Sequence, residues 1–251
     1  MPSERIAIFA DLHSNLEAFE ACLAHAQENG ATRYVFLGDI VGYNANPGEL
    51  VDRVAEMVNN KQAIAVLGNH DAACYESKSL NFNDSALAAI NWTKTQLNHA
   101  QIDFLKNLPL IIREEEACYV HASAHNPGDW NYVMDGMSAW RCAEHSERIY
   151  TFVGHMHDQM LYYQSSVGKL IRFMPHPGDN VPAGKHRRWV SVVGSLGQPR
   201  DGKPQACYAM FSPSEESITY HRVPYDHYLA AEKVMRAGLP QDLADRLLTG
   251  N

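Results

Sequence analysis

The sequence predicts an α/β fold built around two β-sheets. Within residues 5–67, short apolar runs alternate with helical segments, which is typical of a parallel sheet with covering helices. In the second half, short strand candidates follow one another closely, which indicates a second sheet of mixed or antiparallel type. For a chain of 251 residues we expect one domain spanning residues 1–251, with cap elements near residues 75–108 and 123–148.

The first part of the chain reads as strand–helix–strand–helix–strand. Its first helix has Leu16, Phe19 and Leu23 on one face and ends at Gly30. Its second helix opens at Pro47, because proline is well tolerated at the first helical position. In order, we expect a strand at 5–10, a helix at 15–29, a strand at 34–37, a helix at 47–58 and a strand at 63–67.

The rest of the chain supplies further helices and many short apolar runs. Helices are expected over residues 83–98, 101–107, 135–146, 226–236 and 241–248. Strands are expected over residues 111–112, 118–121, 150–153, 160–163, 170–173, 190–193, 206–211 and 218–223.

Charge and cysteine content narrow the class of protein. The formal net charge is −8, whereas a protein that grips nucleic acid usually carries a basic face. We therefore expect no nucleic-acid partner, and the acidic balance counts against a nuclease. The five cysteines are odd in number and no two are spaced as C-x-x-C, so we expect buried free thiols.

No segment of the sequence suggests a membrane or a secreted protein. The apolar run at residues 6–10 is too short for the hydrophobic region of a signal peptide. No stretch approaches the ~20 apolar residues of a membrane span. We expect a cytoplasmic protein without membrane association, and its oligomeric state stays open.

Polar side chains of the metal-binding type follow five of the expected strands. The carboxyl ends of strands form the ligand crevice in open α/β sheets, so these side chains should meet at one rim. Glycines at positions 38, 68 and 154 would let the backbone turn sharply as it leaves the sheet. The candidate ligands are Asp11, His13, Asp39, Asn69, His121, His155 and His157.

The composition of this set predicts two metal ions. Carboxylate, amide oxygen and imidazole together suit Mn, Fe, Zn or Ni better than Ca or Mg. One structural zinc needs four ligands, whereas seven can serve two divalent ions if Asp39 bridges them. Two metals about 3.5–4 Å apart can hold a bridging hydroxide and clamp two oxygens of a phosphate. The pattern therefore indicates hydrolysis of a phosphate ester.

The order of these motifs resembles that of the calcineurin-like metallophosphoesterase superfamily. The shared order is D-x-H, G-D, G-N-H-D, H and G-H-x-H. Segments 38–43 (GDIVGY), 195–202 (SLGQPRDG) and 237–240 (AGLP) are similar to one bacterial and archaeal phosphoesterase subgroup, so the likeness spans the whole chain. The resemblance implies a four-layer α/β/β/α sandwich of two mixed sheets flanked by helices.

The resemblance also implies a role for each residue. Asp11, His13, Asp39 and His157 would hold the first metal, and Asp39, Asn69, His121 and His155 the second. His70 would stand by the phosphate as general acid or charge stabiliser, which suits a side chain with an ordinary pKa near 6.5. The implied substrate is a small-molecule phosphate ester, with nucleotides among the candidates and a preference for diesters. A scaffold that keeps the fold without turnover is the alternative, and the presence of His70 argues against it.

Two positions depart from the family pattern. Ala122 follows His121, where the family often has glycine. Gly42 and Tyr43 stand where the protein-phosphatase branch has an arginine that grips phosphate. The missing arginine argues against a protein phosphatase and against the related dinucleotide tetraphosphatases.

Five further residues are weighed as substrate contacts. Arg200, in the Gln-Pro-Arg-Asp-Gly turn, and His125 are candidate substrate-binding residues. Trp130, Tyr132 and Trp140 could stack on a nucleobase, but core packing is the favoured reading for these aromatics.

Overall fold

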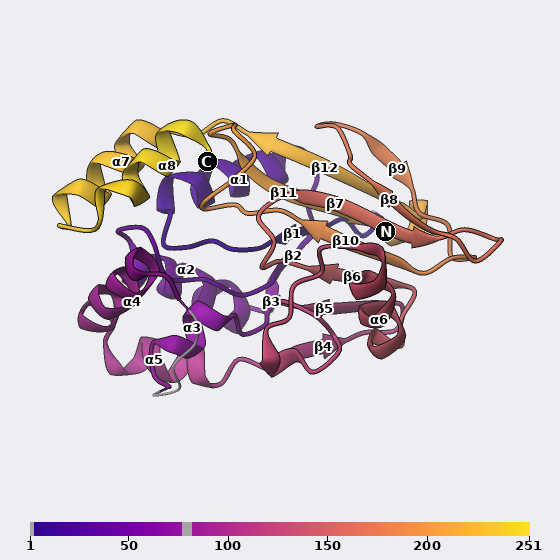
Figure 1. The fold of residues 1–251 in the computed structure, drawn as a ribbon, viewed down its shortest axis with the longest axis horizontal. Coiled ribbons are helices and arrows are strands. Elements are labelled where there is room, and N and C mark those ends of the chain that lie inside the picture. Colours follow the sequence, from indigo (N-terminus) through magenta and orange to yellow (C-terminus); the bar gives the residue numbers. More distant parts are fainter. Residues whose placement is uncertain (1–2, 77–81) are drawn as a thin grey trace.

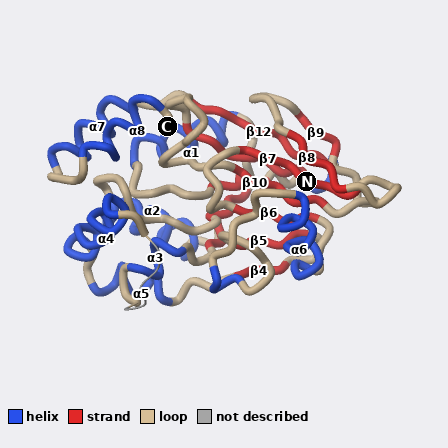
Figure 2. Tube along the Cα trace, in the orientation of Figure 1, coloured by secondary structure: helices blue, strands red, loops and turns tan. Residues whose placement is uncertain are grey.

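The computed structural model describes residues 3–76 and 82–251, which form four layers (Figure 1). Two six-stranded sheets stack face to face. Most helices cover the outer face of the first sheet, and a single helix covers the second (Figure 2). This arrangement confirms the α/β/β/α sandwich.

All expected elements are present, and no end is shifted by more than two residues. The helices are α1 (Leu16–Glu28), α2 (Pro47–Asn59), α3 (Asn69–Ala73), α4 (Asp84–Gln96), α5 (His99–Lys106), α6 (Gly136–Ser146), α7 (His227–Arg236) and α8 (Gln241–Thr249). The strands are β1 (Ile6–Phe9), β2 (Arg33–Phe36), β3 (Ala63–Ala65), β4 (Ile111–Arg113), β5 (Ala117–Val120), β6 (Tyr150–Val153), β7 (Gln159–Gln164), β8 (Leu170–Phe173), β9 (Asn180–Pro182), β10 (Trp189–Val193), β11 (Ala206–Ser212) and β12 (Ser217–Val223). Two short 3₁₀ turns, η1 (Pro127–Asp129) and η2 (Pro213–Glu215), complete the set.

The first sheet, sheet A, is not built from the first part of the chain alone. Its order is β3-β2-β1-β11-β12-β9. β1, β2 and β3 are parallel as predicted, but β11 pairs antiparallel with β1, and β12 and β9 follow it. The expectation that all late strands form the second sheet is therefore wrong. A short buried strand reads the same in either sheet, because its apolar run does not specify a pairing partner.

The second sheet, sheet B, has the order β4-β5-β6-β10-β7-β8. Its centre is parallel, because β6 pairs in parallel with both β5 and β10. The outer strands β4, β7 and β8 join antiparallel, so the sheet is mixed. As a result β1, β2, β3, β5 and β6 all end at the same rim of the sandwich.

The alternation of side chains along β1 shows how the layers are held together. Ile6 and Ile8 point into the apolar layer between the two sheets, with Tyr119, Phe152 and Phe211 among its members. Ala7 and Phe9 face the other way, into the core beneath α1, α2, α7 and α8. Both faces of the strand are buried, which explains its continuous apolar run.

Helix starts follow the expected capping chemistry. The Asn15 side chain accepts the Ala18 N–H at the start of α1, and Asn83 does the same for Ala86 in α4. Asp135 caps α6 together with Ser138 in a reciprocal capping box. Pro47 occupies the first turn of α2, as predicted.

One short helix and one short strand, besides the two 3₁₀ turns, were not expected from the sequence. α3 has only five residues, and β9 is a three-residue edge strand that ends in proline. The predicted cap segments contain α4, α5 and α6, and residues 77–81 of the first segment lie outside the described residues. The assignment of these segments as caps stays a prediction.

Two other expectations can be compared with the described residues. All five cysteines are buried and free, as predicted. Within residues 3–76 and 82–251, no helix combines the length and apolar character needed to cross a membrane.

Candidate metal centre

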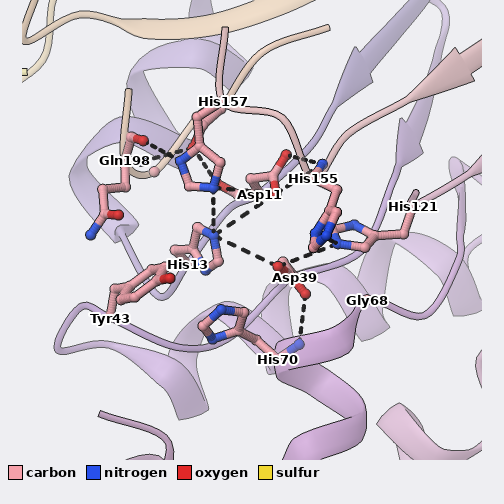
Figure 3. Close-up of polar contacts among 12 residues, drawn as sticks. Asp11, His13, Asp39, Tyr43, Gly68, His70, His121, His155, His157 and Gln198 are labelled. Atoms are coloured by element: carbon pink, nitrogen blue, oxygen red, sulfur yellow. Dashed lines mark hydrogen bonds and ion pairs between the residues drawn. The ribbon is translucent and has the colours of Figure 1, made fainter. Parts of the chain in front are cut away.

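The seven predicted ligands converge at the rim where the parallel strands of both sheets end. Figure 3 labels six of them, and the seventh, Asn69, lies 3.0 Å from His121 Nε2. Asp11 and His13 follow β1, Asp39 follows β2 and Asn69 follows β3, all in sheet A. The remaining three follow β5 and β6 of sheet B: His121, His155 and His157. The site therefore bridges the two sheets.

One group of donor atoms comes from Asp11, His13 and His157. Asp11 Oδ1 lies 3.9 Å from His13 Nε2 and 3.7 Å from His157 Nε2. The two Nε2 atoms lie 3.4 Å apart. All three side chains are buried, so their donor atoms face one shared space.

A second group comes from Asp39, His121 and His155, with Asn69 beside them. His121 Nε2 lies 3.4 Å from Asp39 Oδ2, 3.1 Å from His155 Nδ1 and 3.0 Å from Asn69 Oδ1. Asp39 Oδ2 also lies 3.8 Å from His13 Nε2 of the first group. Figure 3 shows Asp39 between the two groups, in contact with both.

Backbone carbonyls orient three of the histidine rings. His13 Nδ1 lies 3.1 Å from the Val41 carbonyl oxygen, and His121 Nδ1 lies 2.7 Å from that of Leu37. His157 Nδ1 contacts the Gln198 carbonyl in the same way. A carbonyl oxygen only accepts hydrogen bonds, so each Nδ1 carries a hydrogen and donates it. The Nε2 atoms then face the cluster, which is the usual arrangement of metal-binding histidines.

The charges of the cluster fit divalent cations. Burial lowers the pKa of both His13 and His157 well below the ordinary value, so these rings are neutral. With Nδ1 protonated, their Nε2 lone pairs then face each other at 3.4 Å with no proton between them. A metal ion between the two nitrogens would accept both lone pairs and remove their repulsion. The nitrogen and oxygen donors suit Mn, Fe, Zn or Ni.

The two buried carboxylates also need positive charge nearby to stabilise their ionised forms. Burial raises the pKa of the Asp11 carboxyl to about 8, and the charge of Asp39 adds to this effect. Burial acts in the same direction on Asp39, but His121 and His70 hold the pKa of that carboxyl well below its ordinary value. Burial alone would lower the pKa of His121, yet the neighbouring Asp39 raises it to about 9. A proton on His121 thus supplies the charge that a metal ion would supply instead.

Backbone strain is concentrated at the ligands. Asp11, His13, Asp39 and His155 all have positive φ, between +47° and +64°. This left-handed region is uncommon for residues other than glycine and marks functional sites when it recurs in one place. The sharp turns aim each side chain back over the rim.

The three glycines of the motifs are needed for two different reasons. Gly38 has φ +81°, as expected for a sharp turn. Gly68 and Gly154 do not have positive φ, so the predicted reason is wrong for them. A Cβ on Gly68 would lie 2.1 Å from the Asp39 nitrogen, and one on Gly154 would lie 2.8 Å from Asp11 Oδ2. These two glycines let neighbouring ligand loops approach closely.

His70 lies beside the cluster and is almost fully buried. Its backbone N–H donates to Asp39 Oδ1 at 2.8 Å, and its ring lies 4.8 Å from that of His13 and 4.6 Å from that of Tyr43. A Cβ on Gly42 would lie 2.5 Å from His70 Nδ1, so glycine is needed to accommodate this ring. The next residue, Asp71, accepts the N–H groups of Val41 and Gly68, so it links the two loops that follow β2 and β3.

Arg200 lies at the mouth of the site. A cavity of about 430 Å³ opens over the cluster, and Arg200 is among its lining residues. Its Nη2 donates to Gln198 Oε1 at 2.9 Å and to the Tyr43 hydroxyl at 3.2 Å, and its guanidinium lies over the Tyr43 ring. Arg200 is thus held where it could contact a bound phosphate.

His125, the other predicted substrate contact, lies elsewhere. It is not one of the described residues that line this cavity. Its ring lies edge-on to that of His145 on α6, with centroids 4.4 Å apart. The ring thus lies against His145 and not on the cavity wall, and the role of His125 as a substrate contact stays a prediction.

The favoured core-packing interpretation of the aromatics is wrong. Tyr132 and Trp140 are 46% and 41% exposed, and Trp130 is partly exposed. Trp130 and Tyr132 line the cavity over the cluster, whereas Trp140 lies on α6 beside β7 and β8. The sequence could not show which of these aromatics are buried and which line the cavity. Each lies in or next to an irregular or amphipathic segment, where the pattern does not fix burial.

Other cavity residues were missed altogether. Phe82, Asn83 and Asp129 line the same cavity. No motif marks them, and Phe82 is brought to the site only by the packing of α4. The Gln198 carbonyl that orients His157 was also missed, since a main-chain contact leaves no signal in the residue type.

Fold and site together define a metal-dependent phosphoesterase. The family profile of calcineurin-like phosphoesterases matches residues 4–159, and the chain belongs to this family. An uncharacterized protein of Methanocaldococcus jannaschii is 34% identical over 260 residues, and the match covers 100% of both chains.

Solved structures agree with this assignment. A metallophosphoesterase from Sphaerobacter thermophilus is 34% identical, with a TM-score of 0.86 over 99% of this chain and 100% of that one. A hypothetical protein from Pyrococcus horikoshii shares the fold with a TM-score of 0.78 at 19% identity, covering 98% of each chain.

Proposed function

We propose that this protein hydrolyses a small phosphodiester with the help of two divalent metal ions. The observation that carries the proposal is the pair of donor groups that share Asp39. Asp11, His13 and His157 would hold one ion, and Asn69, His121 and His155 the other, with Asp39 bridging them. Bound ions of this kind supply Lewis acidity and lower the pKa of bound water.

The residues around the donors have roles that follow from their positions. Arg200 would bind a phosphate oxygen through its guanidinium, which Gln198 and Tyr43 hold in place. His70 would protonate or hydrogen-bond the leaving oxygen, since its ring lies beside Asp39 and His13. The polar donors and Arg200 together favour a substrate with one anionic phosphorus centre.

The charge of the cavity supports a diester over a monoester. Among the described residues that line it, Arg200 is the one cationic side chain apart from histidines, and Asp129 adds a negative charge. A diester carries one negative charge near neutral pH, whereas a monoester carries nearly two. Apart from the proposed metal ions, the cavity has little positive charge that could neutralise the second negative charge of a monoester.

Replacing Asp39 by Asn tests the proposal. We expect Asp39→Asn to lose most of its bound metal, measured by elemental analysis, and to lose hydrolysis of bis(p-nitrophenyl) phosphate. Chelation of the wild-type protein should abolish the same activity, and added Mn²⁺ or Zn²⁺ should restore it. Asp103→Asn, at an exposed site on α5, is the matched control and should keep both properties.

Two results would contradict the proposal. A metal-free Asp39→Asn variant that still hydrolyses the diester would exclude the metal mechanism. A metal-loaded wild-type protein that is inert on a broad panel of phosphate esters would favour a non-catalytic scaffold.

A further inference from the structure

The space over the metal ligands has two lobes. The larger lobe has a volume of about 430 Å³ and the smaller about 280 Å³. Tyr132, His155, His157 and Arg200 line both, so the lobes meet at the predicted metal ligands. A phosphate bound there would project its two ester groups in two directions.

The larger lobe has aromatic walls that rest on the histidines of the site. The Phe82 ring lies edge-on to His70 at 4.8 Å, and the Trp130 ring lies edge-on to His121 at 5.9 Å. Tyr132 stacks face to face on His155, with centroids 4.0 Å apart and an interplanar angle of 17°. The smaller lobe has instead Met134, Met156 and Asp158 on its walls. Tyr132 lines both lobes, whereas Phe82 and Trp130 are on the wall of the larger lobe alone, so most of the flat aromatic surface lies there.

The placement of Trp130 is not a consequence of core packing. Its φ is +56°, a left-handed conformation that a bulky aromatic residue rarely adopts. The turn η1 before it is entered through Asn126, which also has a positive φ of +51°. The chain holds this ring at the cavity wall in a strained conformation while the ring stays partly exposed.

The polar groups of the larger lobe limit what can bind there. Asn83 and Asp129 lie on its walls beside the aromatic rings. They offer hydrogen-bonding groups at the edge of a stacked ring, which a plain hydrocarbon ring could not use. The Asp129 carboxylate would repel further phosphate groups, so a polyphosphate chain is a poor occupant.

We propose that the larger lobe binds a nucleobase, so that the substrate is a nucleoside ester of a single phosphate. This inference rests on the proposed function, because the phosphate is placed at the metal ligands. Stacking on Trp130 and Phe82 would supply the affinity, as it does in other proteins that bind unpaired bases. The smaller lobe would take the second ester group.

Calorimetric titration of the metal-loaded protein tests the inference without turnover. The probes are methyl phosphate, phenyl phosphate, adenosine monophosphate and adenosine diphosphate. We expect adenosine monophosphate to bind at least about tenfold more tightly than methyl phosphate. Phenyl phosphate should fall between them, and the diphosphate should bind no more tightly than the monophosphate.

Variants of Trp130 test whether the aromatic wall causes the tighter binding of adenosine monophosphate. Trp130→Leu should lose about tenfold in affinity for adenosine monophosphate and keep its affinity for methyl phosphate. Trp130→Phe retains a ring and should keep most of the affinity, which separates stacking from a folding defect. Trp140→Leu is the control, because it removes a 41% exposed tryptophan that lies on α6 away from the lobe.

The outcomes separate this inference from the proposed function. Equal affinities for methyl phosphate and adenosine monophosphate would overturn the nucleobase site, even if diesters are hydrolysed. Phenyl phosphate binding as tightly as the nucleotide would also overturn the nucleobase site, because hydrogen bonds to the edge of the base would then contribute nothing to affinity. Tight, Trp130-dependent nucleotide binding by a protein inert on diesters would instead support the site and refute the proposed hydrolysis.

Discussion

The carboxylate of Asp11 accepts the backbone N–H of His155, with both oxygens within 3.1 Å of the nitrogen. Asp11 follows β1 of sheet A, and His155 follows β6 of sheet B. One predicted ligand therefore holds the loop that carries another, across the boundary between the sheets. The relative position of the two sheets at this contact sets the spacing of the donor atoms.

Gly154→Ala should weaken metal binding by disturbing this contact. The added Cβ would lie 2.8 Å from both Ala10 Cβ and Asp11 Oδ2, so the His155 loop or the Asp11 carboxylate has to move. Overpacking of this kind typically costs about 1–3 kcal/mol in the free energy of unfolding. We expect a weaker metal affinity by calorimetry and a lower melting temperature.

Gly128→Ala is the control for this variant. A Cβ there would meet only Leu110 Cδ1, at 3.7 Å, so neither property should change. Wild-type metal affinity in Gly154→Ala would show that the contact does not position the ligands.

Arg200→Met should reduce kcat/KM for a phosphodiester roughly 10- to 100-fold, as expected for loss of a charge-assisted hydrogen bond of about 1.5–3 kcal/mol. Arg200→Lys should recover only part of the loss, because lysine lacks the planar fork and stacks poorly on Tyr43. Steady-state kinetics on the metal-loaded protein gives the measurement. Arg53→Met removes an exposed arginine of α2 and should leave kinetics unchanged. Unaltered kinetics in Arg200→Met would remove Arg200 from the site.

His221 should make stability fall in acid. Burial lowers its pKa to about 4, with nearby His25 adding to the effect, while its ring stacks on Tyr208. The unfolded chain takes up a proton near pH 6.5 and the folded chain only near pH 4, so stability falls as pH drops between these values. The side chain is only half-buried, so we expect a loss of roughly 1–2 kcal/mol rather than the full effect.

Denaturant unfolding of His221→Gln between pH 7 and pH 4 isolates this contribution. The difference in unfolding free energy between wild type and variant should shrink by that amount as the pH falls. The exposed His176→Gln serves as control. A difference that does not vary with pH would falsify the assignment.

Most of the fold could be predicted because its signals are local. The first strands are short apolar runs, and Asn15 and Asp135 cap helices where expected. Their parallel order followed from the intervening helices. The placement of β11 and β12 in sheet A could not be predicted, because pairing depends on contacts between residues far apart in the chain.

In the candidate site, too, features with a local sequence signal could be predicted and features that depend on long-range packing could not. Asp11, Asp39 and His155 were found because each follows a strand directly, and strand ends meet at one rim. Phe82 escaped prediction and Trp130 was assigned to the core, because their place at the cavity depends on how irregular segments pack. Local pattern thus locates the candidate metal donors, whereas the walls of the cavity need the three-dimensional structure.

Three predicted ligand histidines are oriented by the main-chain oxygens of Leu37, Val41 and Gln198. Every amino acid carries such an oxygen, so the side chains at these three positions can change without altering how the imidazoles are aimed. Related proteins can therefore diverge around the site, and acquire new substrates, while the arrangement of these candidate ligands is inherited intact. In this design the least variable part of the polypeptide, its backbone, preserves the part of the site that tolerates least change.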